Sequence, residues 1–388
     1  MSRAPLSILL AGTLATVPGQ GGWTWVILQY LLGLRRLGHR VFFVDPVAPS
    51  ALRPEGASLA GSTNAAYFRA VVQRFGLEDV STLLLADGSR QTMGAPYDEI
   101  VRAAREADLL VNVSGALCDE AILGRARRRV YLDLDPAFTQ LWHAVQGIDM
   151  GFAAHTDFVT IGPAIGTADC PVPTCGLTWI GTQQPVVLER WPVAGGSPLD
   201  ALTTVANWRG YGSIEHEGVF YGQKVHALRA FITVPTLTNQ RFRLALAIHP
   251  GETADLQALA ANRWEIVDPA AVTATPDDYQ RFIQRSKGEF GIAKTGYVAS
   301  RCGWFSDRSI CYLASGRPVL AQETGFSRVL PAGEGLLAFE TIEQALAGIE
   351  RLNADYATHA RAARALAERY FDSDLVLGRL LERLGVTV

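Results

Sequence analysis

Short apolar runs alternate with amphipathic stretches along the first half of the sequence. An apolar run at 7–12 predicts a buried strand, the spacing at 23–37 predicts a helix that ends at Gly38, and 41–44 predicts a second strand. Together they predict a βαβ unit. The same patterns predict helices at 67–75 and 97–107 and strands at 82–86, 109–113 and 130–134. This alternation favours a parallel sheet with helices on both faces.

Residues 185–198 interrupt the pattern with proline and glycine, which is typical of a linker. Beyond them the alternation resumes, with strands expected at 202–206, 242–248, 264–267, 290–293 and 318–321, and helices at 222–231, 253–261, 306–315, 342–352, 354–370 and 374–384. We therefore expect an α/β fold with two Rossmann-like domains, residues 1–190 and 199–365. Because ligands bind at the carboxyl ends of such strands, the domains are expected to face a shared central cleft.

Composition narrows the class of protein. Of the 388 residues, 48% are hydrophobic and 19% are charged, a balance that favours a globular chain over a disordered one. The net charge of −3 disfavours a broad nucleic-acid-binding face. The five cysteines form neither a CxxC pair nor a zinc-type spacing, so we expect reduced thiols and a cytoplasmic protein. Residues 6–17 imitate a signal peptide, but a buried strand is the favoured interpretation, and no run is long enough to span a membrane.

Two regions have the chemistry of an anion site. Gly21 and Gly22 precede a predicted helix, where glycine allows close approach of a phosphate to backbone N–H groups; the alternative is a simple tight turn. The loop lacks the GxGxxG pattern of dinucleotide-binding proteins. The second region combines an N-cap, an acid in the first turn, a further hydroxyl and three cations, namely Ser306, Asp307, Ser309, Lys294, Arg301 and Arg308.

These three cations beside a helix N-terminus indicate a diphosphate site, although Arg308 could instead pair with Asp307 or Glu323 at the surface. Arg209 follows the predicted strand 202–206 and adds a cation to the same cleft. Lys224 opens the next predicted helix.

The helix that leads into Gly316-Arg317-Pro318-Val319, followed by a polar loop at 322–326, resembles the donor half of GT-B glycosyltransferases. The resemblance implies that Ser306, Arg308 and Ser309 contact the diphosphate of a nucleotide sugar. It also implies that the loop of Glu323, Thr324 and Gly325 reads the sugar, and that the C-terminal helix within 366–388 crosses back to the first domain. Many retaining members carry a glutamate for the ribose where this chain has Cys311, so Asp307 is the substitute candidate.

Candidate catalytic groups lie in the first domain. An inverting transfer needs a base near the acceptor hydroxyl, and Asp135 and His155 are the candidates, each as base or as a group that positions the acceptor. Alternatively, Asp135 caps the turn before Pro136 and His155 is a core histidine. A retaining enzyme would rely on the donor phosphate. We expect no metal, because Asp133-Leu134-Asp135 is typical of a buried strand end rather than of an ion-binding loop.

The leading hypothesis is thus a metal-independent GT-B glycosyltransferase of the hexosyltransferase class, with a nucleotide-sugar donor and an unidentified small-molecule or glycan acceptor. We expect no cofactor apart from this co-substrate, no nucleic-acid partner and no membrane span. A nucleotide-sugar epimerase and a non-catalytic nucleotide-sugar-binding protein are the alternatives. A nicotinamide-dependent oxidoreductase is disfavoured, because the glycine fingerprint around Gly19 to Gly22 is broken and no acid other than Asp45 stands at the second-strand position that binds the ribose.

Overall fold

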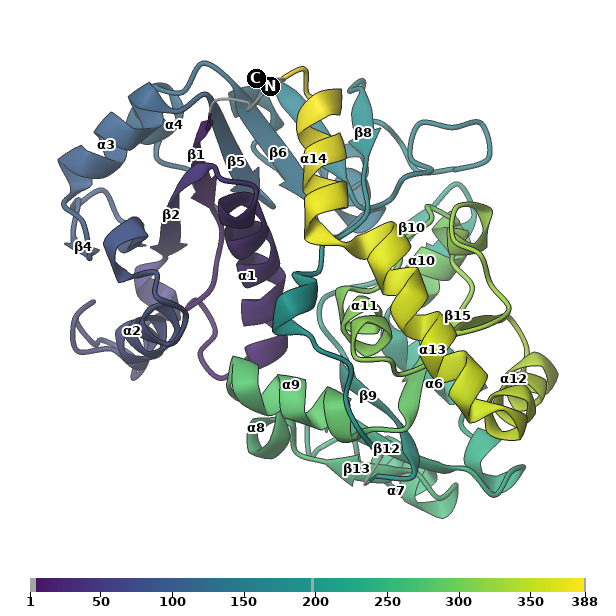
Figure 1. Cartoon of the computed structure of the whole chain (residues 1–388). Helices are drawn as coiled ribbons and strands as arrows, with labels where there is room; N and C mark the ends of the chain where they lie inside the picture. The colour runs from purple at the N-terminus through teal and green to yellow at the C-terminus, as the bar shows by residue number, and fades with distance from the viewer. Residues whose placement is uncertain (1–4, 197–198, 387–388) are drawn as a thin grey trace.

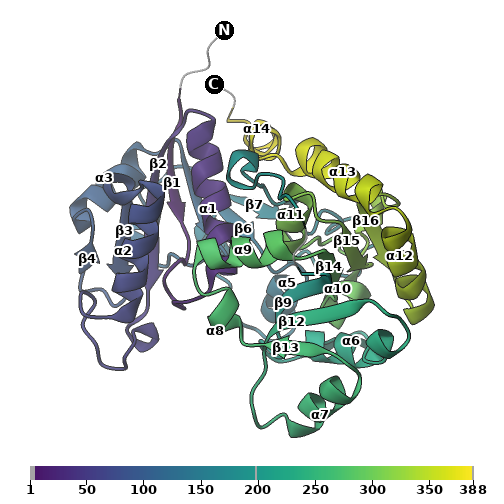
Figure 2. The ribbon, with the colours of Figure 1, turned by 60° about the horizontal axis from the view of Figure 1, so that its bottom comes forward.

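The computed structural model describes residues 5–196 and 199–386, which form two α/β halves (Figures 1 and 2). The sheet of the N-terminal half has eight strands in the order β4-β3-β2-β1-β5-β6-β7-β8. They are β1 (Ser7–Ala11), β2 (Arg40–Val47), β3 (Ser81–Leu85), β4 (Thr92–Met93), β5 (Leu109–Val113), β6 (Arg129–Asp133), β7 (Asp157–Thr160) and β8 (Trp179–Gly181). All neighbours pair in parallel except β3 and β4. The helices of this half are α1 (Gly21–Arg36), α2 (Thr63–Phe75), α3 (Tyr97–Glu106), α4 (Glu120–Leu123) and α5 (Phe138–Ala144).

The C-terminal half repeats the architecture around a six-stranded sheet in the order β13-β12-β9-β14-β15-β16, in which every pair is parallel. Its strands are β9 (Ala201–Asn207), β12 (Arg241–Ala247), β13 (Glu265–Val267), β14 (Gly288–Gly291), β15 (Val319–Gln322) and β16 (Leu336–Phe339), and β10 (Ile214–His216) and β11 (Val219–Tyr221) form a separate hairpin. Its helices are α6 (Lys224–Ala230), α7 (Thr253–Ala261), α8 (Pro269–Val272), α9 (Pro276–Arg285), α10 (Thr295–Ser300), α11 (Asp307–Ala314), α12 (Ile342–Ala354) and α13 (Tyr356–Leu366).

The predicted α/β class is confirmed, and the long apolar runs became the central strands. The run at 7–12 forms β1, a buried strand between β2 and β5. Several short elements were not predicted, among them α9, α10 and the hairpin. Helix α10 has six residues, too few to display a hydrophobic period of 3.6. Helix α9 is strongly amphipathic but is mostly polar, with buried side chains such as Tyr279 and Phe282 on one face.

The chain crosses between the halves twice. After α13 a π-helical turn (Ala367–Phe371) leads into α14 (Ser373–Arg383), which packs on α1 of the N-terminal half, as Figure 1 shows. Gly33 permits this close packing, since a Cβ there would lie 2.6 Å from the Leu377 side chain. The other crossing touches the first one, because Val186 N donates to Phe371 O and Ser373 N donates to Val186 O.

The two halves also meet where the start of α1 lies against α8 and α9 (Figure 2). Gly21 N donates a hydrogen bond of 2.9 Å to Thr273 O, and the Trp25 indole donates one of 2.8 Å to Pro276 O. Since both acceptors are backbone carbonyls of the C-terminal half, this contact fixes the amino end of α1 beside the second sheet.

Candidate functional site

A cavity of about 1030 Å³ lies between the carboxyl ends of the two sheets. In each sheet the strand order reverses at one place, between β1 and β5 in the first and between β9 and β14 in the second. The carboxyl ends of these strands and the segments after them line the cavity, among them Val17–Gln20 after β1, Ser114 after β5, Asn207 at the end of β9 and Lys294 after β14. Ligands of open α/β sheets bind at such reversal points, so the topology marks this cavity as the candidate site.

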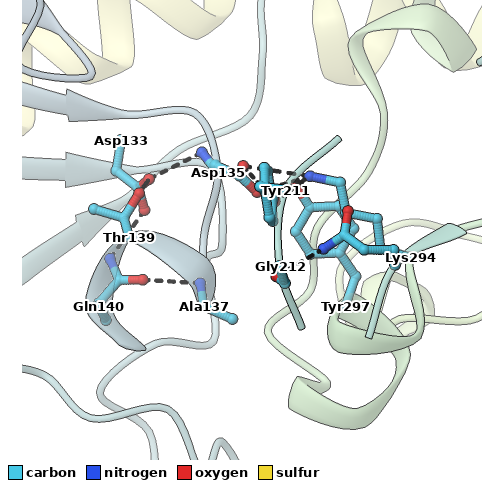
Figure 3. Close-up of polar contacts among 10 residues, drawn as sticks. Asp133, Asp135, Ala137, Thr139, Gln140, Tyr211, Gly212, Lys294 and Tyr297 are labelled. Atoms are coloured by element: carbon cyan, nitrogen blue, oxygen red, sulfur yellow. Dashed lines mark hydrogen bonds and ion pairs between the residues drawn. The ribbon is translucent and has the colours of Figure 1, made fainter. Parts of the chain in front are cut away.

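Asp135 and Lys294 connect the two walls of the cavity. Lys294 Nζ lies 3.3 Å from both carboxylate oxygens of Asp135, and both side chains are about one-quarter exposed. The hydroxyl of Tyr211 donates to Asp135 Oδ2 at 2.5 Å, and that of Tyr297 donates to Oδ1. Lys294 also lies over the Tyr211 ring, 4.1 Å from its centroid. In Figure 3 Asp135 projects from the N-terminal half toward these three side chains.

Asp133 holds the strand end that presents Asp135. It is fully buried and accepts hydrogen bonds from Asp135 N, Thr139 Oγ1 and Gln140 Nε2 at 2.7 to 3.0 Å (Figure 3). A fourth hydrogen bond comes from Thr160 Oγ1 at 2.8 Å. Burial raises the pKa of Asp133, although these donors act in the opposite direction. The sequence placed both acids at a cleft edge, but Asp133 is structural and Asp135 faces the cavity.

Burial and the neighbouring charges shift the pKa values of the side chains around Asp135. Burial lowers the pKa of Lys294, and the neighbouring Asp135 offsets part of this effect. Burial and the Asp135 charge both raise the pKa values of Tyr211 and Tyr297. Both phenols therefore stay protonated at neutral pH and donate to Asp135, which serves as the carboxylate of this cluster.

Arg308 is presented at the start of α11, where Ser306 is the N-cap. Its Nε donates to Glu289 Oε1 at 2.5 Å and its Nη1 donates to Val205 O at 3.0 Å. Burial alone would lower the pKa of Arg308, but the Glu289 charge raises it overall, so this guanidinium is permanently charged. Ser306, Asp307 and Arg308 all line the cavity, which brings three predicted residues together. Burial raises the pKa of Asp307, against the effect of Arg308.

Lys224 is the unpaired cation of the cavity. It is the first residue of α6 and lines the cavity, yet its ammonium makes no hydrogen bond or ion pair within residues 5–196 and 199–386. Burial lowers its pKa well below the usual value, and the charges of Arg308 and Lys294 act in the same direction, whereas Glu289 and Asp307 oppose them. An anionic ligand would supply the partner that this ammonium lacks.

Gly21 and Gly22 have a different role from the predicted one. Gly21 N is occupied by Thr273 O, and a Cβ on Gly21 would lie 2.1 Å from Thr275 O. A Cβ on Gly22 would lie 2.7 Å from the Tyr279 ring, although Gly22 itself lines the cavity. These glycines therefore allow the two halves to approach each other, and Gly21 has no free N–H group for a phosphate.

Three of the predicted donor-binding residues on the C-terminal half are absent from the described lining of the cavity. Arg209 is exposed and pairs with Glu252 at 2.5 Å, and Arg301 is exposed and pairs with Glu340 at 3.4 Å. Ser309 is buried one residue beyond Arg308. The predicted convergence of Lys294, Arg301 and Arg308 is therefore incomplete, because Arg301, at the end of α10, pairs with Glu340 and is not among the described lining residues.

The loop of Glu323, Thr324 and Gly325 also lies outside the described lining of the cavity. Glu323 is buried and accepts from Gly325 N at 2.6 Å, and Thr324 Oγ1 donates to Trp304 O. A Cβ on Gly325 would lie 2.5 Å from Arg301 O. In this structure the loop supports the segment between α10 and α11, and the sugar contact implied by the resemblance stays a prediction.

His155 is not brought to the cavity either. It is 8% exposed, its Nδ1 lies 2.8 Å from Gly151 O and its Nε2 lies 3.1 Å from Asn112 Nδ2. Burial lowers its pKa. These contacts match the alternative of a satisfied core histidine, so His155 leaves the set of candidate catalytic groups. Asp45 is likewise fully buried and accepts from Leu14 N and Ala15 N.

Sequence reasoning missed the two tyrosines that surround Asp135. Tyr297 lies three residues after Lys294, a spacing that places both on one side of a helix, and Tyr211 lies in the glycine-rich loop after β9. Among the described residues no group of three or more His, Cys, Asp or Glu side chains is placed to hold a metal ion. No helix in the described ranges has the length and apolar character that a membrane crossing requires.

No protein-family model matches the sequence, and no curated protein matches it. Solved structures do match. An alpha-glucosyltransferase in complex with UDP and a 13-mer DNA containing a HMU base is 12% identical with a TM-score of 0.62, over 98% of this chain and 99% of that chain. Anabaena Alr3699/HepE in complex with UDP-glucose is 15% identical with a TM-score of 0.61, over 98% of this chain and 100% of that one. The chain thus has a two-sheet α/β fold that matches GT-B glycosyltransferase structures over nearly its whole length.

Proposed function

We propose that this chain is a glycosyltransferase that moves a hexosyl group from a nucleoside-diphosphate sugar to a hydroxyl acceptor. The observation that carries the proposal is the convergence of Lys224, Lys294 and Arg308 on one cavity between the two sheets, with Lys224 lacking any partner among the described residues. A diphosphate carries two negative charges and would pair with these cations. UDP-glucose is the first donor to test, because solved structures of similar fold hold UDP or UDP-glucose.

The C-terminal wall also offers an apolar slot for a nucleobase. Ala247 ends β12 and Ile248 follows it, and Ile266 and Val267 end β13; all four residues line the cavity. We propose that the base lies in this slot and that the diphosphate lies over the start of α11. Asp307 then remains the candidate for the ribose hydroxyls, since this residue lines the cavity.

Asp135 is the proposed group at the acceptor hydroxyl. It is the carboxylate on the N-terminal wall, and Lys294 and two tyrosines hold it in place. In the transfer, the bond between sugar C1 and the diphosphate oxygen breaks, and the diphosphate leaves with the electron pair while Lys224 and Arg308 stabilise its charge. The acceptor oxygen bonds to C1, and its proton passes to Asp135.

Donor binding tests this proposal directly. UDP and UDP-glucose should raise the melting temperature of the full chain and bind measurably by calorimetry. Lys224→Ala should weaken binding by about 10- to 100-fold, since it removes a charge-assisted contact. Lys287→Ala is the matched control, because Lys287 pairs with Asp200 at 2.8 Å just before β14 and does not line the cavity. If neither compound binds, the proposal is wrong.

Turnover separates a transferase from an epimerase. NMR of UDP-glucose mixed with the protein alone should show slow hydrolysis or no reaction. A new nucleotide-sugar epimer formed without acceptor would contradict the transferase proposal and favour the epimerase.

A further inference from the structure

The charges of the cavity are divided between its two walls. The cations that line it, Lys224, Lys294 and Arg308, all belong to the C-terminal half. The described residues of the N-terminal half that line it include no lysine, arginine or histidine, and their one charge, Asp135, is paired with Lys294. An anionic acceptor would therefore find no counter-ion on the wall where the acceptor is expected.

The N-terminal wall is also strongly apolar. Its lining side chains include Trp23, Leu134, Trp142 and Met150, and the two indoles are partly exposed. The Trp23 indole is fixed from behind, since its Nε1 donates to Thr13 O. Trp142 packs edge-on against the Tyr211 ring, with centroids 4.7 Å apart. Indole faces held in this way are platforms for flat apolar groups.

The apolar surface continues beyond the cavity. Val17 lines it and is 50% exposed, and Val145 and Ile148, in the loop after α5, are 38% and 47% exposed. Ile148 N donates to Trp142 O at 3.0 Å, so this loop is held against Trp142. An acceptor that occupies the cavity would extend over an apolar rim.

Few polar groups on this wall are free to bind an acceptor. The amide of Gln20, the hydroxyl of Ser114 and the indole N–H of Trp142 make no side-chain hydrogen bond within residues 5–196 and 199–386, whereas Thr139 Oγ1 is used by Asp133. An oligosaccharide has many hydroxyl groups, and most of them would lose their hydrogen bonds to water without replacement.

From these observations we infer the class of acceptor: an uncharged alcohol or phenol whose reactive hydroxyl is carried on an apolar, ring-containing body. The inference rests on the proposed function. The ring lies on the indole faces of the N-terminal wall and the hydroxyl points to Asp135. The reaction is the one given above: C1 gains the acceptor oxygen, loses the diphosphate oxygen, and the hydroxyl proton passes to Asp135. A nucleic acid or an oligosaccharide does not fit this wall.

Binding of probe acceptors to the full chain with saturating UDP tests the inference. The probes are naphthalene-2-methanol, the neutral trisaccharide cellotriose and a DNA duplex containing hydroxymethyluracil. Saturation-transfer NMR and calorimetry should show the tightest binding for naphthalene-2-methanol, and UDP-glucose should convert it to a glucoside. Trp142→Ala should weaken its binding by about tenfold, and Trp142→Phe by less, because a ring face is retained.

The control variant is Phe220→Ala, which removes an aromatic side chain that is 43% exposed and outside the described lining of the cavity. It should leave binding of both UDP and the alcohol unchanged, and Trp142→Ala should leave UDP binding within about twofold. If Trp142→Ala does not fold, Trp23→Ala takes its place with the same expectation. Tighter binding of cellotriose or DNA, or no binding of the alcohol while UDP binds, overturns the inference alone. Failure of UDP to bind overturns the proposed function itself.

Discussion

Lys294 Nζ lies 3.3 Å from each carboxylate oxygen of Asp135, so a single ion pair spans the cavity between residues that are 159 positions apart in the chain. Each partner also has a proposed role in the reaction, Lys294 toward the diphosphate and Asp135 toward the acceptor. A diphosphate that binds Lys294 competes with Asp135 for the same ammonium. Donor binding should therefore weaken the ion pair and leave the Asp135 carboxylate free to accept a hydrogen bond from the acceptor hydroxyl.

The variant Asp135→Asn distinguishes the role of Asp135 toward the acceptor from the role of Lys294 toward the diphosphate. The variant keeps the shape of the side chain but removes the charge, so release of UDP from UDP-glucose in the presence of an acceptor should fall by about 100-fold or more. Affinity for UDP-glucose should be retained or increased, because Lys294 no longer has a competing carboxylate. Steady-state kinetics and calorimetry measure both effects. Asp149→Asn, an exposed acid that accepts only from Gly151 N at 2.8 Å, is the control. Wild-type turnover in Asp135→Asn would remove Asp135 from the mechanism.

Substitutions at Arg308 and Glu289 should affect the free energy of unfolding and the affinity for the donor differently. Arg308→Met leaves the fully buried Glu289 carboxylate without its partner, and we expect a loss of about 3–5 kcal/mol in the free energy of unfolding. The double variant Arg308→Met with Glu289→Gln should recover most of this stability, because the Glu289 carboxylate is no longer left buried without its partner. Both variants should bind UDP-glucose much more weakly than the wild type.

Urea unfolding and calorimetry check this pair of expectations. Arg241→Met is the control, since Arg241 pairs with Glu265 at the surface and should contribute less than about 1 kcal/mol. Wild-type affinity in the double variant would show that Arg308 acts in folding alone.

Donor affinity should depend on pH through Lys224. Burial lowers the pKa of this ammonium in the free protein, whereas a bound diphosphate favours its charged form. Binding therefore takes up a proton when Lys224 is neutral, so affinity is highest below the lowered pKa and falls as the pH rises through it. UDP-glucose is the suitable ligand because its diphosphate does not titrate between about pH 6 and 9.

Lys224→Arg isolates this contribution. Arginine stays charged across that range, so the fall in affinity should be smaller in this variant, and any residual slope should reflect Lys294, whose pKa is also lowered. Calorimetry in buffers of different ionisation enthalpy counts the protons taken up. Identical pH profiles for the wild type and Lys224→Arg would refute the assignment.

Gly21→Ala should weaken the contact between the two halves. The added Cβ would lie 2.1 Å from Thr275 O, a backbone atom that can move only with α9, so we expect destabilisation of about 1–3 kcal/mol and weaker UDP-glucose binding. Gly378→Ala is the matched control. No atom lies within 4 Å of its added Cβ, and it lies inside α14, so it should be neutral or stabilise by up to about 1 kcal/mol. Thermal unfolding measures both, and equal melting temperatures would contradict the role given to Gly21.

The alternation of apolar and amphipathic segments was sufficient to predict the α/β class, because each buried parallel strand is a continuous apolar run that needs no knowledge of its partners. Asp135 and Lys294 could be named for a similar reason, since both follow such runs. The contact between them could not be predicted, because it depends on how the two sheets face each other.

Predictions failed where a residue type suits two purposes. Glycines before a helix can allow an anion to approach the backbone, or they can allow close packing of two segments. Gly21 packs closely on Thr275 O. A glutamate in a polar loop can bind a ligand or accept a hydrogen bond from a nearby backbone N–H group. Glu323 accepts one from Gly325 N. An unpaired cation is recognised only when all its neighbours are known, so Lys224 became a leading candidate with the structure and not before it.

The two crossings of the chain, joined by hydrogen bonds between Val186, Phe371 and Ser373, have a mechanical consequence. They join the two halves at one place, so a single proteolytic cut in the linker after Arg190 would leave the halves covalently attached through the segment between α13 and α14.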